Sequence, residues 1–251
     1  MRHLFTPEGE AALEAVMRLA PLLAFDFDGT LAPIVDRPDD ARVAEPVARC
    51  LATLARTLPV AIITGRSVAD VRPRLGFEPD FVIGNHGVEN PHDSADVGAE
   101  RALDALRLRI AAQDAALLRA GVAVEDKGYS VALHYRLAPD AGAALASIDA
   151  TLQGFAPTLR RFGGKCVVNV VAAGVPDKGD ALAALVERSG ARAAVFVGDD
   201  VNDEAVFARA APPWLTVRIG RDPASAAMYV LESQRELAGV LQRMIGLLVP
   251  R

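Results

Sequence analysis

Two aspartates, Asp26 and Asp28, directly follow the four apolar residues Leu22–Phe25 in the stretch PLLAFDFDGTLAP. Pro21 and Gly29 bound this region, which predicts a buried strand that ends in a turn. Because side chains alternate between the two faces of a strand, the two carboxylates start on the same side. Two like charges held together are costly unless a cation or a proton separates them. An ordinary Asp-Gly turn into solvent would give the same letters, so the rest of the chain must decide.

Other residues that could contact a ligand also stand where apolar runs end. Along the chain they are Thr30 after the first run, Thr64, Gly65 and Arg66 after the next, Asn85 and His86 after a third, and Asp199, Asp200 and Asp203 after a later one, with Lys178 at the start of a helical pattern. Ligands of parallel sheets bind beyond the carboxyl ends of the strands, so we expect these groups to meet there. His86 lies in a turn, where it would either reach a substrate or cap its loop.

A carboxylate cluster with one ammonium group indicates a site for Mg²⁺ and a phosphoryl group. Mg²⁺ takes hard oxygen ligands, keeps several waters and lets a substrate phosphate complete its octahedron. Lys178 and the backbone N–H groups of Gly29 and Thr30 suit phosphoryl oxygens. Asp26 would be the nucleophile that forms an aspartyl-phosphate. Asp28 would protonate the leaving oxygen and then deprotonate the attacking water, which explains why the two carboxylates share one site.

The pattern around these residues alternates between strands and helices. Beyond the first strand we expect a helix at Glu45–Leu58, strands at Pro59–Gly65, Asp80–Asn85, Ala194–Asp199 and Leu215–Gly220, and a helix that begins at Lys178. The strands are continuously apolar, which is typical of a parallel sheet that helices cover on both faces. The fold class expected is therefore α/β with a parallel sheet.

The middle of the chain has a different pattern. Two helices, at Val97–Gly121 and Pro139–Gly154, alternate with the strand pairs VAVEDKG and YSVALHYR, then TLRRFGG and KCVVNVVA. This order suits a small sheet with helices on one face. We therefore expect a catalytic core of residues 1–91 and 174–251 and an inserted α/β domain of residues 92–173.

Bulk composition excludes several classes of protein. Of 251 residues 51% are hydrophobic, which argues against disorder, and the net charge of −5 with scattered basic residues argues against nucleic-acid binding. Only two cysteines occur, far apart, and no apolar run reaches the ~18 residues of a membrane span. We expect a soluble, cytoplasmic monomer with a small-molecule partner and no membrane or nucleic-acid contact.

Four stretches, DFDGTL, ITGR, DKG and GDDVNDE, resemble the four motifs of the haloacid dehalogenase-like (HAD) phosphatases and span nearly the whole chain. The resemblance implies a Rossmannoid core with an inserted α/β cap, and a phosphoric monoester hydrolase that uses Mg²⁺. It implies the following roles: Asp26 as nucleophile, Asp28 as acid/base and, through its carbonyl, metal ligand, Thr64 and Lys178 on the phosphate, Asp26 and Asp199 on the metal, and Asp200 and Asp203 orienting the metal or its waters.

Within this family the chain is most similar to the trehalose-6-phosphate phosphatases of trehalose biosynthesis. The similar stretches are LLAFDFDGTLAPI, IITGR, VIGNHGVE, EDKGYSVALHYR and GKCVVNV followed by DKG. The resemblance implies that the substrate's sugar contacts Glu125, Lys127, Arg136, Lys165 and Asn169. The family usually carries a glutamate where this chain has Asn169, and an asparagine accepts a sugar hydroxyl but lacks the charge.

The spacing of these residues, considered without the resemblance, also indicates how their side chains are arranged in the inserted domain. Glu125 and Lys127 are two apart, and Lys165 and Asn169 are four apart, so each pair would share one face of its strand. The alternate positions are mostly apolar. A sheet with one apolar and one polar face would suit a lid over a hydroxyl-rich ligand, while ordinary charge alternation on an exposed sheet would give the same pattern.

Two further hypotheses stay open at this point. The chain would act on another sugar phosphate, as a capped HAD phosphatase or a phosphomutase, because GDDVNDE also resembles the motif of those enzymes. A non-catalytic sugar-phosphate sensor would keep the fold, but a sensor has no need of the acid/base residue Asp28.

Overall fold

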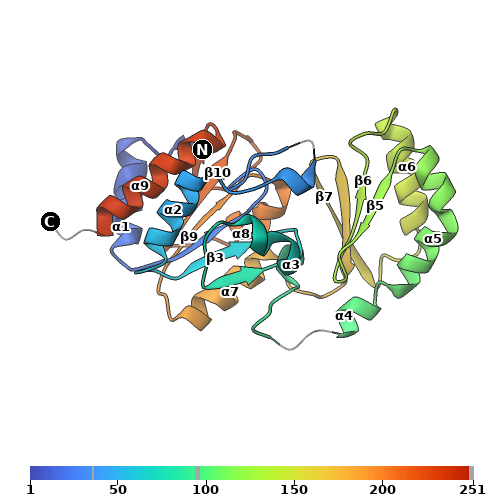
Figure 1. The fold of residues 1–251 in the computed structure, drawn as a ribbon, viewed down its shortest axis with the longest axis horizontal. Helices are drawn as coiled ribbons and strands as arrows, with labels where there is room; N and C mark the ends of the chain where they lie inside the picture. Colours follow the sequence, from blue (N-terminus) through green and yellow to red (C-terminus); the bar gives the residue numbers. More distant parts are fainter. Residues whose placement is uncertain (36, 94–96, 249–251) are drawn as a thin grey trace. The chain divides into compact units, whose positions relative to one another are not determined.

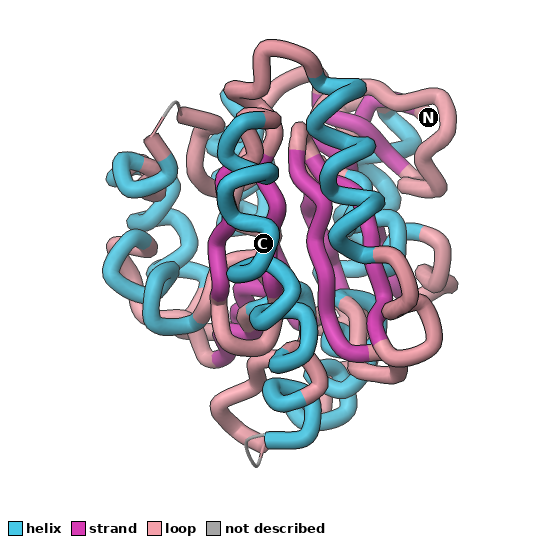
Figure 2. Tube along the Cα trace, turned by 90° about the vertical axis from the view of Figure 1, so that its right-hand side faces the viewer, coloured by secondary structure: helices cyan, strands magenta, loops and turns pink. Residues whose placement is uncertain are grey.

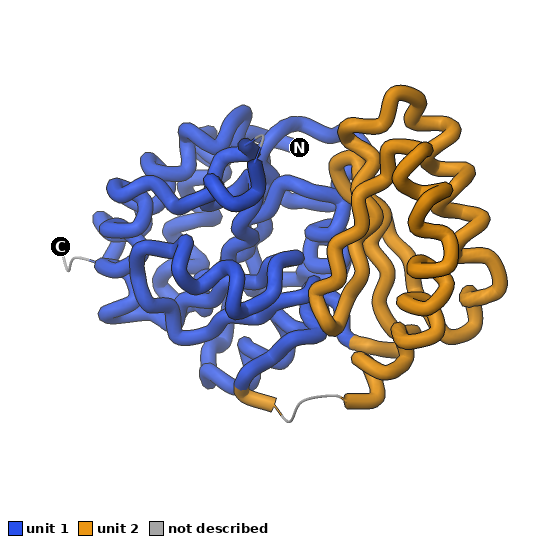
Figure 3. The backbone as a smooth tube through the Cα atoms, turned by 45° about the vertical axis from the view of Figure 1, so that its right-hand side comes forward, with its two compact units in different colours: residues 1–91, 176–251 blue, residues 92–175 orange. Residues whose placement is uncertain are grey.

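The computed structural model describes residues 1–35, 37–93 and 97–248, whose contacts divide into two compact units (Figure 3). Met1–Pro91 and Pro176–Arg251 form one unit, called here the core unit. His92–Val175 form the other, called the inserted unit. The second crossing of the chain between the units lies two residues later than the boundary expected at 173/174.

The core unit contains a seven-stranded sheet in which every neighbouring pair is parallel (Figure 1). In spatial order the strands are β1 (Arg2–His3), β11 (Tyr229–Leu231), β10 (Trp214–Ile219), β9 (Ala194–Gly198), β2 (Leu22–Phe25), β3 (Val60–Ile63) and β4 (Phe81–Ile83). The α/β class with a parallel sheet is thereby confirmed. The two short strands β1 and β11 were not predicted from the sequence.

Helices pack on both faces of this sheet, which is why its strands are apolar throughout. Leu23 and Phe25 of β2 lie in a cluster with α1 (Pro7–Met17), α2 (Glu45–Leu54) and α9 (Leu237–Leu248). The alternate residues Leu22 and Ala24 lie in a second cluster with α7 (Lys178–Ser189) and α8 (Glu204–Phe207). All four strand residues are fully buried. A strand with both faces covered leaves polar chemistry to its ends.

The inserted unit is an antiparallel sheet with helices on one face (Figures 1 and 2). Its strands follow the order β5 (Ala123–Asp126), β6 (Val131–His134), β8 (Val167–Ala172) and β7 (Leu159–Gly164). Val131, Leu133 and Val170 pack against α5 (Asp104–Arg119) and α6 (Ala141–Leu152). Residues between these positions, including Glu125 and Asn169, belong to the opposite face.

Two expectations for the inserted unit are wrong in detail. The helix expected at Val97–Gly121 is two helices, α4 (Val97–Arg101) and α5, because Leu103 turns into the core and its N–H bonds the carbonyl of Glu100 in a tighter turn. The strand expected from Lys165 starts at Val167, because Cys166 adopts a left-handed conformation with φ of 59°. Lys165 therefore lies in the β7–β8 turn, where strand alternation with Asn169 does not apply.

Within the described part of the chain, none of the helices combines the length and apolar character that crossing a membrane requires.

Candidate active site

Three predicted site residues meet where the central strands of the core unit end. β2 lies between β3 and β9, and Phe25 pairs with both Ile62 and Val197. The strands therefore end at the same level of the sheet, and the polar residues that follow them are Asp26, Thr64 and Asp199. All three are at least nine-tenths buried, as expected for groups held inside a site.

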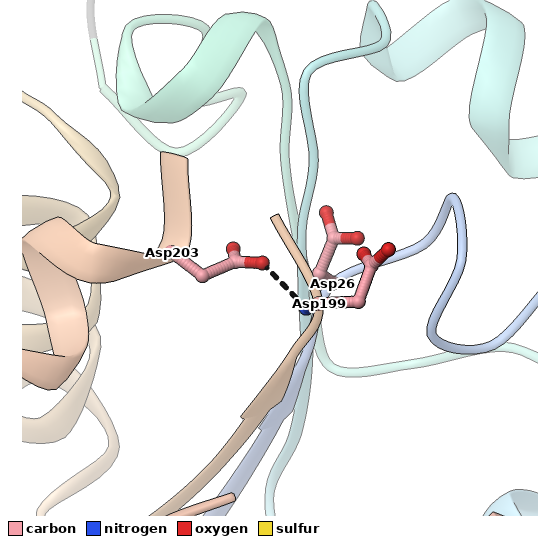
Figure 4. Close-up of side chains that lie close together, drawn as sticks. All are labelled: Asp26, Asp199 and Asp203. Carbon is pink, nitrogen blue, oxygen red and sulfur yellow. Dashed lines mark hydrogen bonds between the residues drawn. The ribbon is translucent and has the colours of Figure 1, made fainter. Parts of the chain in front are cut away.

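Three carboxylates form a buried acidic cluster at these strand ends (Figure 4). Asp26, Asp199 and Asp203 each contribute an oxygen atom, and these atoms lie within 4.8 Å of one another. Asp203 closes the 3₁₀ turn Val201–Asp203, and its Oδ2 accepts hydrogen bonds from the N–H groups of Asp199 (2.8 Å) and Asp200 (3.0 Å). Asp203 thereby fixes the loop that carries Asp199.

Lys178 provides the positive charge of the acidic cluster. Its Nζ donates to Asp26 Oδ1 and to Asp203 Oδ1, each at 2.7 Å, and the side chain is 2% exposed. Burial disfavours the ammonium form, but Asp203 and Asp26 outweigh it and raise the pKa of Lys178. Burial also raises the pKa of Asp26 well above its usual value, in spite of the neighbouring lysine.

The sequence positions Lys178 through the start of α7. Asp177 caps this helix, because its side chain accepts hydrogen bonds from the N–H groups of Gly179 (2.8 Å) and Asp180 (3.0 Å). In turn, the side chain of Asp180 accepts a hydrogen bond from the N–H of Asp177, which completes a capping box. Arg209 donates to both carboxylates, at 2.8 Å and 2.7 Å. A capped and bridged first turn holds the lysine in a fixed place at the end of the sheet.

The turn after β2 requires a glycine at position 29. Gly29 has a φ of 85°, and a Cβ there would lie 2.1 Å from Asp199 Oδ2. Thr30 is fully buried and its hydroxyl donates to Asp199 Oδ1 at 3.4 Å. The N–H groups of Gly29 and Thr30 donate to the carbonyls of Ala32 and Phe27, so in this structure they close the turn instead of standing open for phosphate.

Asp28 lies apart from the acidic cluster, in a bidentate ion pair with Arg66. Arg66 Nε donates to Asp28 Oδ2 and Nη2 donates to Oδ1, both at 2.8 Å. The Arg66 guanidinium also donates to Asp70 Oδ2 (2.7 Å) and to the carbonyl of Pro38 (2.9 Å), and it lies 5.2 Å from the centre of the Phe27 ring. β2 ends at Phe25, so the strand alternation expected to place Asp26 and Asp28 on one side does not extend to Asp28. Arg66, for which a contact with either an aspartate or the substrate is expected, here orients the carboxylate of Asp28.

A strained loop brings His86 to the turn that follows β3. Asn85 and His86 both have left-handed backbones, with φ of 50° and 61°, which is rare for two adjacent residues other than glycine. Asn85 Nδ2 donates to Glu89 Oε2 at 2.8 Å, and the His86 N–H donates to the carbonyl of Thr64. A Cβ on Gly65 would lie 2.3 Å from the imidazole, so the ring packs directly on that glycine.

Asp200 has a structural task in the loop after β9. It caps the turn Val201–Asp203, with Oδ1 accepting from the N–H of Val201 at 2.8 Å and Oδ2 near Asn202 Nδ2 at 3.5 Å. Among the described residues, the third member of the acidic cluster is Asp203 and not Asp200. The four-residue spacing from Asp199 to Asp203 is the signal in the sequence, because a helical turn brings such residues together.

The acidic cluster fits a divalent metal cation. Three buried carboxyl groups share a single ammonium group, and burial disfavours the charge on each of them unless a further cation offsets it. All the candidate ligand atoms are hard oxygens, which Mg²⁺ prefers. Asp203 already accepts hydrogen bonds on both of its oxygens, so Asp26 and Asp199 are the better ligands.

The inserted unit brings together part of the predicted sugar-binding set. Glu125 Oε2 lies 3.4 Å from Lys127 Nζ, and Arg136 Nη2 donates weakly to the carbonyl of Lys165 at 3.4 Å. Asn169 is 3% exposed. In the sheet, Glu125 pairs with Ala132, Ala132 with Asn169 and Asn169 with Phe162, so these residues form one row on the face opposite the helices.

Several proteins of known sequence are similar to most of this chain. The chain is 38% identical over 202 residues to a protein of Mycobacterium tuberculosis named an uncharacterized glycosyl hydrolase, covering 74% of this chain and 15% of that protein. It is 34% identical over 250 residues to a trehalose-phosphate phosphatase of Mycolicibacterium paratuberculosis, covering 89% of this chain and 62% of the relative. The chain therefore spans less than two thirds of the length of these relatives.

Solved structures share the fold at low sequence identity. A trehalose-6-phosphate phosphatase related protein superposes with a TM-score of 0.72 at 24% identity, covering 90% of this chain and 98% of the other. The C-terminal domain of the C. albicans trehalose-6-phosphate phosphatase superposes with a TM-score of 0.74 at 20% sequence identity, covering 94% of this chain and 96% of the other. A sugar phosphatase of HAD subclass IIB superposes with a TM-score of 0.59 at 17% sequence identity, covering 91% of this chain and 100% of the other. These likenesses confirm the HAD-like fold class.

Residues 24–213 match the sequence model of the trehalose-phosphatase family. The matched region includes Asp26, Lys178 and the whole acidic cluster, as well as the inserted unit. The chain therefore belongs to the trehalose-phosphatase family.

Proposed function

We propose that this protein is a Mg²⁺-dependent phosphatase that hydrolyses trehalose 6-phosphate to trehalose and phosphate through an aspartyl-phosphate, as a step of trehalose biosynthesis. The observation that carries the proposal is the buried Asp26, bonded by Lys178 at 2.7 Å and clustered with Asp199 and Asp203. Family membership and the name of the M. paratuberculosis relative, a trehalose-phosphate phosphatase, support the choice of substrate.

The first half of the reaction is transfer of the phosphoryl group to Asp26. Lys178 binds Oδ1, so Oδ2 is the oxygen that attacks phosphorus while the bond to the sugar oxygen breaks. Asp28 donates a proton to that sugar oxygen, and trehalose leaves as a neutral alcohol. We assign Lys178 and the Thr64 hydroxyl to the phosphoryl oxygens. Mg²⁺ held by Asp26, Asp199 and the carbonyl of Asp28 would neutralise charge on the phosphoryl group.

The second half is hydrolysis of the aspartyl-phosphate. Water attacks phosphorus, Asp28 takes one of its protons, and the bond between phosphorus and Asp26 breaks to release phosphate. Each carboxyl returns to its starting protonation state. Because both oxygens of Asp28 are held by Arg66 in an ion pair, Asp28 must leave Arg66 and take up a proton from solvent before it can donate that proton to the leaving group.

We propose that residues of the inserted unit recognise the sugar. Glu125 and Asn169 offer carboxylate and amide oxygens to hydroxyl groups, and they stand in one row of the sheet. Lys127, Arg136 and Lys165 offer donors. In the core unit, Gly65, Asn85 and His86 line the turn beside Thr64, and we place the phosphorylated end of the substrate there.

Another sugar phosphate is the second candidate substrate. Asn169 stands where the family usually has a glutamate, and the loss of a charge changes which hydroxyl patterns are bound tightly. A capped HAD phosphatase for a hexose phosphate, or a phosphomutase, would keep the chemistry of the core unit unchanged.

Phosphate release from a small substrate panel tests the proposal. The panel contains trehalose 6-phosphate, glucose 6-phosphate, sucrose 6-phosphate and an aryl phosphate, each assayed with Mg²⁺ and with a chelator. We expect a strong preference for trehalose 6-phosphate that the chelator abolishes. Equal release from all members, or preference for another sugar, would overturn the substrate, and no release from any member would leave a sensor as the better hypothesis.

A further inference from the structure

His134 is a polar residue of the inserted unit that has no role in the proposed function so far. It lies on the same face of the sheet as Glu125 and Asn169, opposite the helices. It pairs with Ala123 on β5, two residues before Glu125, so the two side chains are diagonal neighbours on one face. The imidazole Nε2 lies 2.9 Å from Glu125 Oε2. Ala132, directly opposite Glu125, is small, which leaves the diagonal histidine able to reach the carboxylate.

The bonding around Glu125 is asymmetric. Both His134 Nε2 and Lys127 Nζ contact the same oxygen, Oε2, at 2.9 Å and 3.4 Å. Among the described residues, no hydrogen bond is found on the other oxygen, Oε1. The hydrogen bond from His134, with help from Lys127, lowers the pKa of Glu125, so the carboxylate stays ionised. One oxygen is anchored and the other is presented as a charged acceptor.

Stability alone gives a weak reason for such an arrangement. The side chains of His134 and Glu125 are 39% and 52% exposed, and ion pairs at that exposure contribute little to folding stability. An anchored carboxylate oxygen is useful where a ligand must meet an acceptor already in place, because less side-chain freedom is then lost on binding.

We propose that His134 is a positioning residue for sugar recognition: its Nε2–H anchors Glu125 Oε2 so that Oε1 accepts hydrogen bonds from sugar hydroxyls. This inference rests on the proposed function, and it adds a residue that does not itself touch the reacting atoms. It predicts an effect on substrate binding and not on phosphoryl transfer.

Two substitutions separate the anchoring hydrogen bond from the bulk of the ring. His134→Phe keeps an aromatic ring and removes the donor, while His134→Gln places an amide donor near the position of Nε2. We expect His134→Phe to raise KM for trehalose 6-phosphate about tenfold, with kcat changed by less than about twofold. His134→Gln should restore KM to within about threefold of the wild type.

The control variant is His3→Phe, which breaks a similar pair in the core unit, His3 Nε2 to Glu236 Oε2 at 3.1 Å. It should leave every kinetic constant unchanged, and an aryl phosphate should respond to none of the three variants. Far-UV circular dichroism and urea unfolding establish that each variant folds.

An unchanged KM in His134→Phe, an equal defect in His134→Gln, or an equal loss on the aryl phosphate would overturn the inference. Failure of the proposed function is distinguishable, because it shows in the wild-type protein as no preference for trehalose 6-phosphate before any variant is compared. In that case the inference falls with it.

Discussion

The acidic cluster of the core unit and the Glu125 group of the inserted unit both set a basic residue beside a carboxylate, but in different surroundings. Lys178 is 2% exposed and holds two carboxylates at 2.7 Å. Glu125 is half exposed, with its partners at 2.9 Å and 3.4 Å on one oxygen. The first group is fixed by burial, and the second keeps an oxygen open to a ligand.

This contrast matches two different chemical demands. Phosphoryl transfer needs charges in fixed positions, and burial in a medium of low polarity strengthens each electrostatic contact there. Sugar recognition needs hydrogen-bond acceptors that exchange water for hydroxyls at little cost, which half-exposed groups do. We therefore expect substitutions in the acidic cluster to reduce turnover of every substrate, and substitutions in the Glu125 group to reduce recognition of the sugar.

The largest effect should come from removing the nucleophile. Asp26→Asn keeps the size of the side chain but removes the anionic oxygen that attacks phosphorus, so kcat should fall by about 10⁴-fold or more on every substrate. The matched control is Asp114→Asn, on the exposed side of α5, with kinetics equal to wild type. A kcat of Asp26→Asn close to the wild-type value would contradict a mechanism in which Asp26 forms a covalent aspartyl-phosphate.

The second largest effect should be a loss of unfolding free energy, which we expect to differ between a lysine of the core unit and a lysine of the inserted unit. Lys178→Met leaves the buried Asp26 and Asp203 without their cation, and breaking a buried ion pair costs about 3–5 kcal/mol of unfolding free energy. Lys165→Met removes an exposed lysine of the inserted unit and should cost less than about 0.5 kcal/mol. Urea unfolding in the presence of a chelator measures both. Equal losses would show that the buried lysine is not a structural requirement.

The smallest effect should depend on pH. Burial works against the shift, but Arg74 and Arg66 lower the pKa of Asp70. Its stabilising contribution is therefore complete above the unfolded pKa of about 3.9, and it is lost as the pH falls through the lower folded value. The side chain of Asp70 is 36% exposed, so the contribution is modest.

Asp70→Asn should lower the unfolding free energy by about 1 kcal/mol at neutral pH, and the difference from wild type should shrink below about pH 4. Urea unfolding of the two proteins at matched pH values measures this difference. A difference that grows as the pH falls would contradict the assignment.

Sequence patterns predicted the part of the site that depends on strand ends. An apolar run followed by a polar residue specifies both a buried strand and what stands at its end, so the meeting of Asp26, Thr64 and Asp199 could be predicted. The start of α7 was predictable for a similar reason, because Asp177 and Asp180 form a capping box before an apolar helix face.

Contacts made by long side chains across loops could not be predicted in this way. Arg66 follows β3, and whether it points to a ligand or to Asp28 depends on where the turn after β2 returns. The break before Leu103 has no glycine or proline to mark it, and the left-handed Cys166 is unusual for its residue type. Tertiary packing decided these points.

The most direct test of the division between the two units is the effect of Glu125→Ala on two substrates. We predict that kcat/KM for trehalose 6-phosphate falls about 100-fold, while kcat/KM for an aryl phosphate stays within about twofold of wild type. Such a result would place the choice of sugar in the inserted unit and the chemistry in the core unit. An equal loss on both substrates, or no loss on either, would contradict the account.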